Sequence, residues 1–220
     1  MSMKKHIVCF GDSNTHGYCA DPNDTETRSD RFSENERWTC LLQKALGEDY
    51  LVLEEGLSGR TTVFPDPLHE SMSGLDVIYS TLMSHEPVDL LILMLGTNDT
   101  KERLGANAAC IGIGMERLVM KAKTVPAWRD GKPNILLIAP PHIGEGLYLR
   151  PEGVPMGPGC PEKSRGVAER FAVVAQNQGC AFLDAEGLAE FNKLDCMHLT
   201  RLGHKQLADK LSELVPTLLG

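Results

Sequence analysis

The sequence predicts an α/β fold, a three-layer α/β/α sandwich in which helices cover both faces of a five-stranded parallel sheet. Five short runs rich in Val, Ile and Leu alternate along the chain with longer segments whose apolar residues recur every three or four positions. The longer spacing is that of a helix that packs one face on a sheet. The short runs are almost continuously apolar, which indicates burial on both faces and therefore a parallel sheet.

The expected elements alternate along the whole chain. The expected strands are residues 6–10, 51–54, 90–95, 134–138 and 181–183. The expected helices between them are residues 38–46, 75–84, 111–122 and 166–177, and a last helix over 202–214 follows Thr200, a residue type that often caps a helix N-terminus. With 220 residues, 42% of them hydrophobic and 24% charged, the chain has a globular composition, and we expect one domain over residues 1–220.

The charge balance argues against a nucleic-acid binder. The chain has 22 Lys and Arg against 30 Asp and Glu, a net charge of −8, whereas phosphate affinity comes from clustered cations. The apolar run at residues 7–10 is shorter than the ~7–15 residues of a signal-peptide core. No run reaches the ~18 apolar residues of a membrane span. We therefore expect a cytoplasmic protein with no nucleic-acid or membrane partner.

The seven cysteines are scattered without a Cys-x-x-Cys pair, so neither a disulfide framework nor a thiolate zinc site is expected. Cys19 and Cys160 lie in polar loops and are the thiols expected to be exposed. We expect no cofactor and no metal.

Two connections are longer than the usual two to six residues of such loops. Residues 18–36 are polar and acidic, and residues 140–165 are rich in proline and glycine. Each is expected to be a wall of the site, a lid or an assembly contact, or else simply mobile surface.

Polar, turn-forming residues follow each of the first three expected strands. These clusters are GDSN at 11–14, GLSGRT at 56–61 and GTND at 96–99. In an open parallel sheet, ligands bind outside the carboxyl ends of the strands, near the point where the strand order reverses. In the flavodoxin-like order 2-1-3-4-5 these three ends are neighbours, and the DCMH cluster at 195–198 can reach the same edge.

These clusters contain the groups that acyl transfer needs. A serine such as Ser13 becomes a nucleophile when a histidine takes its proton, and a carboxylate must hold the histidine in the right tautomer. The spacing of Asp195 and His198 lets the carboxylate reach one ring nitrogen while the other faces the serine. The backbone N–H groups of Ser13 and Gly59 and the amide of Asn98 are three candidate donors to an oxyanion. There is no G-x-S-x-G elbow, so the usual α/β-hydrolase fold is not indicated.

Four blocks of the sequence resemble, in order, those of the GDSL or SGNH hydrolases. They are GDSNTHG, the glycine in EEGLSGRTT, LGTND and DCMH. The longer strings FGDS, RW, LDVIYS, DLLILMLGTNDTK and APP are similar to the bacterial arylesterase and acyltransferase branch. The resemblance implies the SGNH α/β/α fold and a metal-free serine esterase that often forms homo-oligomers.

By matching positions, the resemblance makes Ser13 the nucleophile, His198 the base and Asp195 its orienter, with Gly59 and Asn98 as oxyanion donors. Two positions beside the serine depart from the family pattern. Asn14 stands where the family name has leucine, and His16 where the branch often has tryptophan. The expected activity is hydrolysis of small, short-acyl carboxylic esters.

Several alternatives stay open at this point. The same fold supports acyl transfer to an alcohol, perhydrolysis, or deacetylation of acetylated sugars. A metal-dependent hydrolase would use Asp12, Asp99 and His198 around a divalent ion. A non-catalytic binder on the same scaffold is a third possibility. Outside the site, Arg60 is expected to pair with a loop carboxylate or to support an interface, and the remaining histidines, such as His69, are read as structural or surface residues.

Overall fold

The computed structural model describes residues 3–149, 151 and 153–220. Its five strands form one parallel sheet in the order β2-β1-β3-β4-β5. The strands are β1 (Lys5–Gly11), β2 (Tyr50–Gly56), β3 (Leu90–Met94), β4 (Ile135–Ala139) and β5 (Ala181–Asp184). The predicted fold class and strand order are confirmed.

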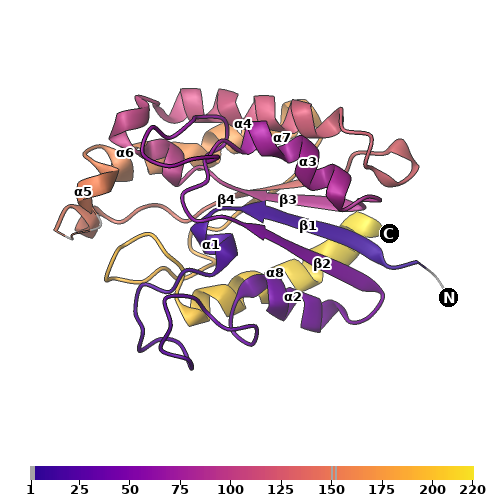
Figure 1. The fold of residues 1–220 in the computed structure, drawn as a ribbon, viewed down its shortest axis with the longest axis horizontal. Coiled ribbons are helices and arrows are strands. Elements are labelled where there is room, and N and C mark those ends of the chain that lie inside the picture. The colour runs from indigo at the N-terminus through magenta and orange to yellow at the C-terminus, as the bar shows by residue number, and fades with distance from the viewer. Residues whose placement is uncertain (1–2, 150, 152) are drawn as a thin grey trace.

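Helices cover both faces of the sheet (Figure 1). One layer contains α3 (Gly74–Ser84), α4 (Ala108–Lys123) and α7 (Val167–Gln178), and the opposite layer contains α2 (Trp38–Leu46) and α8 (Arg201–Leu219). The first helix, α1 (Ser13–His16), is a single turn at the end of β1.

Alternate residues of each strand face the two helical layers. In β1, Val8 and Phe10 belong to the core under α3, α4 and α7, whereas Ile7 and Cys9 belong to the core under α2 and α8. All four are buried. Burial on both faces explains why the strands read as continuous apolar runs.

The long helices match their predicted bounds within a few residues, except at the C-terminus. The last helix was expected to end at residue 214, but α8 continues to Leu219 through Pro216. The added turn is stabilised by packing, because Val215 is buried and Leu218 and Leu219 pack against the core under α2 and α8.

The connection at 140–165 is more ordered than its composition indicates. It contains the 3-10 helix η4 (Glu145–Leu149) and the short helices α5 (Gly153–Met156) and α6 (Cys160–Arg165). Three further 3-10 helices, η1 (Asn98–Thr100), η2 (Glu102–Leu104) and η3 (Arg129–Gly131), lie elsewhere in the chain. Among the helices described here, none combines the length and apolarity needed to cross a bilayer.

The prediction that Cys19 and Cys160 are exposed is wrong. Both are buried, because each loop folds over its own thiol: the Cys19 Sγ lies 3.0 Å from the carbonyl oxygen of Asp21, and the Cys160 Sγ lies 3.3 Å from that of Gly157. The exposed thiol is Cys110, at the start of α4.

Candidate active site

The ends of three neighbouring strands bring the predicted polar clusters together. In the sheet register, Gly11 of β1 lies beside Gly56 of β2 and Met94 of β3. The clusters that follow these residues therefore start side by side at the end of the sheet where α1 lies (Figure 1).

Ser13 is the first residue of α1, and Asp12 caps this short helix. The carboxylate of Asp12 accepts a hydrogen bond from the backbone N–H of Asn14 (3.0 Å). Ser13 is almost buried, at 6% exposure. The turn lies so close to β2 that a Cβ atom at Gly56 would collide with the backbone of Thr15 and His16. A glycine at position 56 is what lets the serine sit directly over the strand ends.

Ser13, His198 and Asp195 form one continuous hydrogen-bonded chain. The His198 Nε2 lies 2.8 Å from the Ser13 Oγ, and the His198 Nδ1 lies 2.5 Å from the Asp195 Oδ2. The ring of Tyr18 lies beside the imidazole, with centroids 4.5 Å apart. The structure therefore brings together the three residues that the sequence singled out as nucleophile, base and orienter.

The pKa of Asp195 lies below its ordinary value. Burial alone would raise it, but the side chain of His198 and the backbone N–H groups of Met197 and His198 stabilise the carboxylate. Asp195 therefore remains an anion that fixes the histidine ring with its Nδ1 proton toward the carboxylate.

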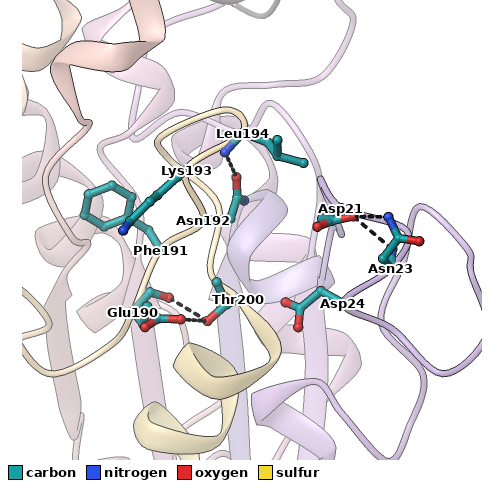
Figure 2. A pocket seen from close by; sticks show the side chains of 9 residues that line it. All are labelled: Asp21, Asn23, Asp24, Glu190, Phe191, Asn192, Lys193, Leu194 and Thr200. Carbon is teal, nitrogen blue, oxygen red and sulfur yellow. Dashed lines mark hydrogen bonds between the residues drawn. The ribbon is translucent and has the colours of Figure 1, made fainter.

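The turn that presents Asp195 and His198 is organised by Asn192, which the sequence analysis did not identify. Its side-chain oxygen accepts from the N–H groups of Leu194 (2.9 Å, Figure 2) and Asp195 (3.0 Å), and its amide donates to the carbonyl of His198 (2.9 Å). Cys196 completes the turn in the left-handed region, with φ of 61°. An asparagine three residues before the aspartate is the signal that marks this turn.

Asn98 and Gly59 both line the cavity beside Ser13. Asn98 is nearly buried, and its Nδ2 donates to the Asp12 Oδ2 at 3.4 Å, which orients the amide. Gly59 has φ of +94°, a conformation that side-chain-bearing residues rarely adopt. The five predicted site residues thus converge on one cavity.

Two further carboxyls, Asp12 and Asp99, are fully buried beneath the site. Burial raises the pKa of each to about 6. Asp99 binds the N–H of Thr62 at 2.9 Å and its hydroxyl, and Asp12 binds Asn14 and Asn98. Their described contacts are thus those of buried organisers of backbone and side chains. Within the described residues, no group of three or more His, Cys, Asp and Glu side chains has the arrangement of a metal site.

The cavity has a volume of about 510 Å³ and draws walls from both long connections. Tyr18 comes from the first, and Pro155 and Met156 come from the second. The lining consists of Ser13, Tyr18, Ser58, Gly59, His69, Thr97, Asn98, Lys101, Arg103, Pro155, Met156, Asp195, Met197 and His198. Of the roles expected for these connections, the structure supports that of a wall.

A second cavity, of about 550 Å³, is lined by residues just before and just after the Asp195–His198 turn. Figure 2 shows it between the segment of Asp21 and Asp24 and the segment of Glu190 and Lys193. None of the five predicted site residues lines this cavity.

His69 is exposed, in line with its expected place at the surface, and it also lines the cavity. His16, at the position where the branch often has tryptophan, is not among the described lining residues. Among the described residues, Arg60 has no loop carboxylate as a hydrogen-bonding partner. It donates to the backbone carbonyls of Gly11 (3.1 Å) and Glu55 and stacks on Phe10 at 4.1 Å, so the expected carboxylate pairing is not observed and the expected interface role stays a prediction.

Lys101 and Arg103, which line the cavity, were not singled out from the sequence. Both follow the third strand within five residues of Asn98, and two cations so close to a predicted oxyanion donor are the signal that was available.

Comparison with known proteins identifies the family of this chain. The model of the GDSL-like Lipase/Acylhydrolase family matches residues 9–206. The chain is similar to the aryl esterase of M. smegmatis, with a TM-score of 0.86 and 33% identity over 98% of this chain and 100% of that one. It is similar to a carbohydrate acetylesterase family member from Sinorhizobium meliloti, with a TM-score of 0.87 and 33% identity over 98% and 99% of the two chains. No match was found among curated proteins.

The chain belongs to the GDSL-like lipase/acylhydrolase family, the SGNH hydrolases, and is a carboxylic ester hydrolase. A lipase/acylhydrolase from Enterococcus faecalis, at 18% identity and a TM-score of 0.71, shares the fold.

Proposed function

We propose that this protein is a serine esterase that hydrolyses small, short-acyl carboxylic esters through Ser13, His198 and Asp195. The observation that carries the proposal is the hydrogen-bonded chain from the Ser13 hydroxyl through His198 to the Asp195 carboxylate. The same chain of groups activates serine in unrelated hydrolase folds.

The reaction would proceed in two steps. His198 takes the hydroxyl proton as the Ser13 Oγ attacks the ester carbonyl, and the resulting oxyanion accepts hydrogen bonds from the Ser13 and Gly59 N–H groups and the Asn98 amide. The alcohol then leaves with the proton held by His198. Water, deprotonated by the same imidazole, hydrolyses the acyl-enzyme and frees Ser13.

We propose acetyl to butyryl esters as the favoured range. The cavity of about 510 Å³ must hold both sides of the ester, and Pro155 and Met156 form one of its walls.

The test compares 4-nitrophenyl acetate and butyrate hydrolysis by the wild type, by Ser13→Ala and by Ser80→Ala, each with and without EDTA. Ser80 is an exposed serine on α3 and serves as the matched control. We expect turnover by the wild type and Ser80→Ala, no effect of EDTA, and near-background rates for Ser13→Ala. Activity retained by Ser13→Ala would exclude the serine mechanism, and activity lost on chelation would point to a metal-dependent hydrolase.

A second candidate is deacetylation of small acetylated sugars. It is favoured by the similarity to the S. meliloti carbohydrate acetylesterase, which equals the similarity to the aryl esterase in sequence identity. Release of acetate from acetylated glucose and from aryl acetates, compared as kcat/KM, decides between the two. A higher value for the sugar would make the carbohydrate ester the substrate class.

A further inference from the structure

Two cations share one carboxylate in the wall of the catalytic cavity. Arg103 binds both oxygens of Asp66, with its Nε 2.8 Å from Oδ1 and its Nη2 2.6 Å from Oδ2. Lys101 binds the same carboxylate, with its Nζ 3.1 Å from Oδ2. The Asp66 side chain is fully buried and does not line the cavity, whereas both cations do.

Asp66 does not need Lys101 for neutralisation. The fork of Arg103 pairs with both of its oxygens, and the Leu68 N–H donates to Oδ1 at 3.0 Å. A second cation leaves this cluster of three charges with one positive charge in excess. Burying such a charge costs free energy unless another group compensates it.

The ammonium group of Lys101 lies close to Gly59, one of the predicted oxyanion donors. A Cβ atom built on Gly59 would lie 4.0 Å from its Nζ. Lys101 is only 5% exposed, and among the described residues the Asp66 carboxylate is the one hydrogen-bonding partner of its ammonium group. An ammonium group has three donors, so two remain to bind a molecule in the cavity.

The other acidic groups that the structure describes near the cavity are already engaged. Asp195, the one carboxylate among the described lining residues, is bound to His198. Asp12, beneath the cavity, accepts hydrogen bonds from Asn14 and Asn98. The wall formed by Lys101 and Arg103 is therefore the part of the cavity that attracts an anion.

We propose that Lys101, supported by Arg103, binds an anionic group of the substrate, so that the preferred substrates are small esters that carry a carboxylate close to the ester bond. This inference rests on the proposed function and adds the substrate class. A carboxylate on either side of the ester would accept a charge-assisted hydrogen bond from the Lys101 Nζ while the carbonyl lies over Ser13. Arg103 holds Asp66 and thereby leaves the ammonium group available.

The test uses two pairs of nearly isosteric substrates. The first pair is 4-acetoxybenzoate and 4-acetoxybenzamide, with the charge on the alcohol side. The second is monomethyl glutarate and its amide, methyl 4-carbamoylbutanoate, with the charge on the acyl side. The kcat/KM values are measured at pH 7.5 for the wild type, for Lys101→Gln and for Lys205→Gln. Lys205 is exposed on α8, where it pairs with Asp209, and serves as the control for the loss of one positive charge.

We expect the wild type to favour the anionic member of at least one pair by about tenfold or more, as a charge-assisted hydrogen bond predicts. Lys101→Gln should lose most of this preference, and Lys205→Gln should keep it. Equal kcat/KM values for both members of both pairs in the wild type would overturn the inference. So would an equal loss for the charged and neutral esters in Lys101→Gln, because the lysine would then act on the carbonyl or on folding.

Two further measurements test the anion site independently of the Lys101 variant and of the serine mechanism. Inhibition of wild-type 4-nitrophenyl acetate hydrolysis by 4-hydroxybenzoate and by 4-hydroxybenzamide needs no variant, and the anion should inhibit about tenfold more strongly if the lysine binds on the alcohol side. If the proposed serine mechanism fails, Ser13→Ala hydrolyses the neutral esters as well as the wild type does. If only the anion site fails, Ser13→Ala is inactive and the wild type shows no preference for charge.

Discussion

Asn14 holds the backbone on both sides of His198. Its Nδ2 donates to the carbonyl of Met197 at 3.3 Å, and its Oδ1 accepts from the N–H of Leu199 at 2.9 Å. The residue directly after the proposed nucleophile is thus tied to the residues that flank the proposed base. This contact joins the β1–α1 turn to the loop before α8. It is made by Asn14, the residue that stands where the family name has leucine.

Replacing the Asn14 amide should misplace His198 relative to Ser13. We expect Asn14→Leu to lower kcat for 4-nitrophenyl acetate by about tenfold or more, since a small misplacement of a catalytic group is costly. Two buried backbone groups would lose their partners, at about 1–3 kcal/mol each. Urea denaturation and steady-state kinetics measure the two effects. Unchanged kcat and stability would show that the contact does not position His198.

The Asp195 carboxylate should act through the tautomer of His198. In Asp195→Asn, the amide fills the same space but no longer stabilises the imidazolium or holds the ring with its Nδ1 proton toward residue 195. We expect kcat to fall by about 10³–10⁴ with little change in KM. A circular dichroism spectrum equal to that of the wild type is the control for folding. A loss of less than tenfold would remove Asp195 from the mechanism.

Asn98 should contribute to the rate and little to substrate affinity, because an oxyanion forms only in the transition state. We expect Asn98→Ala to lower kcat by about 10²–10³ while KM stays within a few-fold of the wild type. Asn177→Ala, at an exposed position on α7, is the matched control. A rise in KM at constant kcat would mean that Asn98 binds the ground state of the substrate instead.

Glu36 should make stability depend on acid pH. Its carboxylate accepts from the N–H groups of Glu26 and Ser33 (2.8 and 2.9 Å) and from the Thr25 hydroxyl. Burial alone would raise the pKa of Glu36, but these donors lower it to about 2. The unfolded chain therefore binds this proton more readily, so the contribution is complete above about pH 5 and is lost as the pH falls toward 2.

A pKa that falls from 4.5 to about 2 on folding corresponds to about 3 kcal/mol. We expect Glu36→Gln to lower the free energy of unfolding by about this amount at pH 7 and by much less at pH 2.5. Glu34→Gln, whose side chain is 80% exposed, should differ little from the wild type at any pH. Urea denaturation at several pH values measures the difference, and a difference independent of pH would contradict the assignment.

The order and kind of the elements followed from the sequence because the signals are local. The strands on either side of Ser13 and Asn98 are apolar runs, and their carboxyl ends had to meet once the strand order was known. The five site residues could therefore be placed at one edge without coordinates. The C-terminal end of α8 could not be predicted from the sequence. Packing of Val215 carries the helix past its expected end at residue 214 and through Pro216.

What the sequence determined by itself was the fold class and the chemical groups of the site, since hydrophobic periodicity and the residues after each strand encode them directly. The strand order agrees with the flavodoxin-like order that was assumed for this fold class. Only the tertiary structure decided which residues position these groups and which other side chains line the same cavity. Asn14 and Leu199 lie 185 positions apart, and Asp66 and Arg103 lie 37 apart. Such pairs are brought together by loops that have no periodic pattern, so their contacts, and the anion-attracting wall that we infer from them, depend on the folded path of the chain.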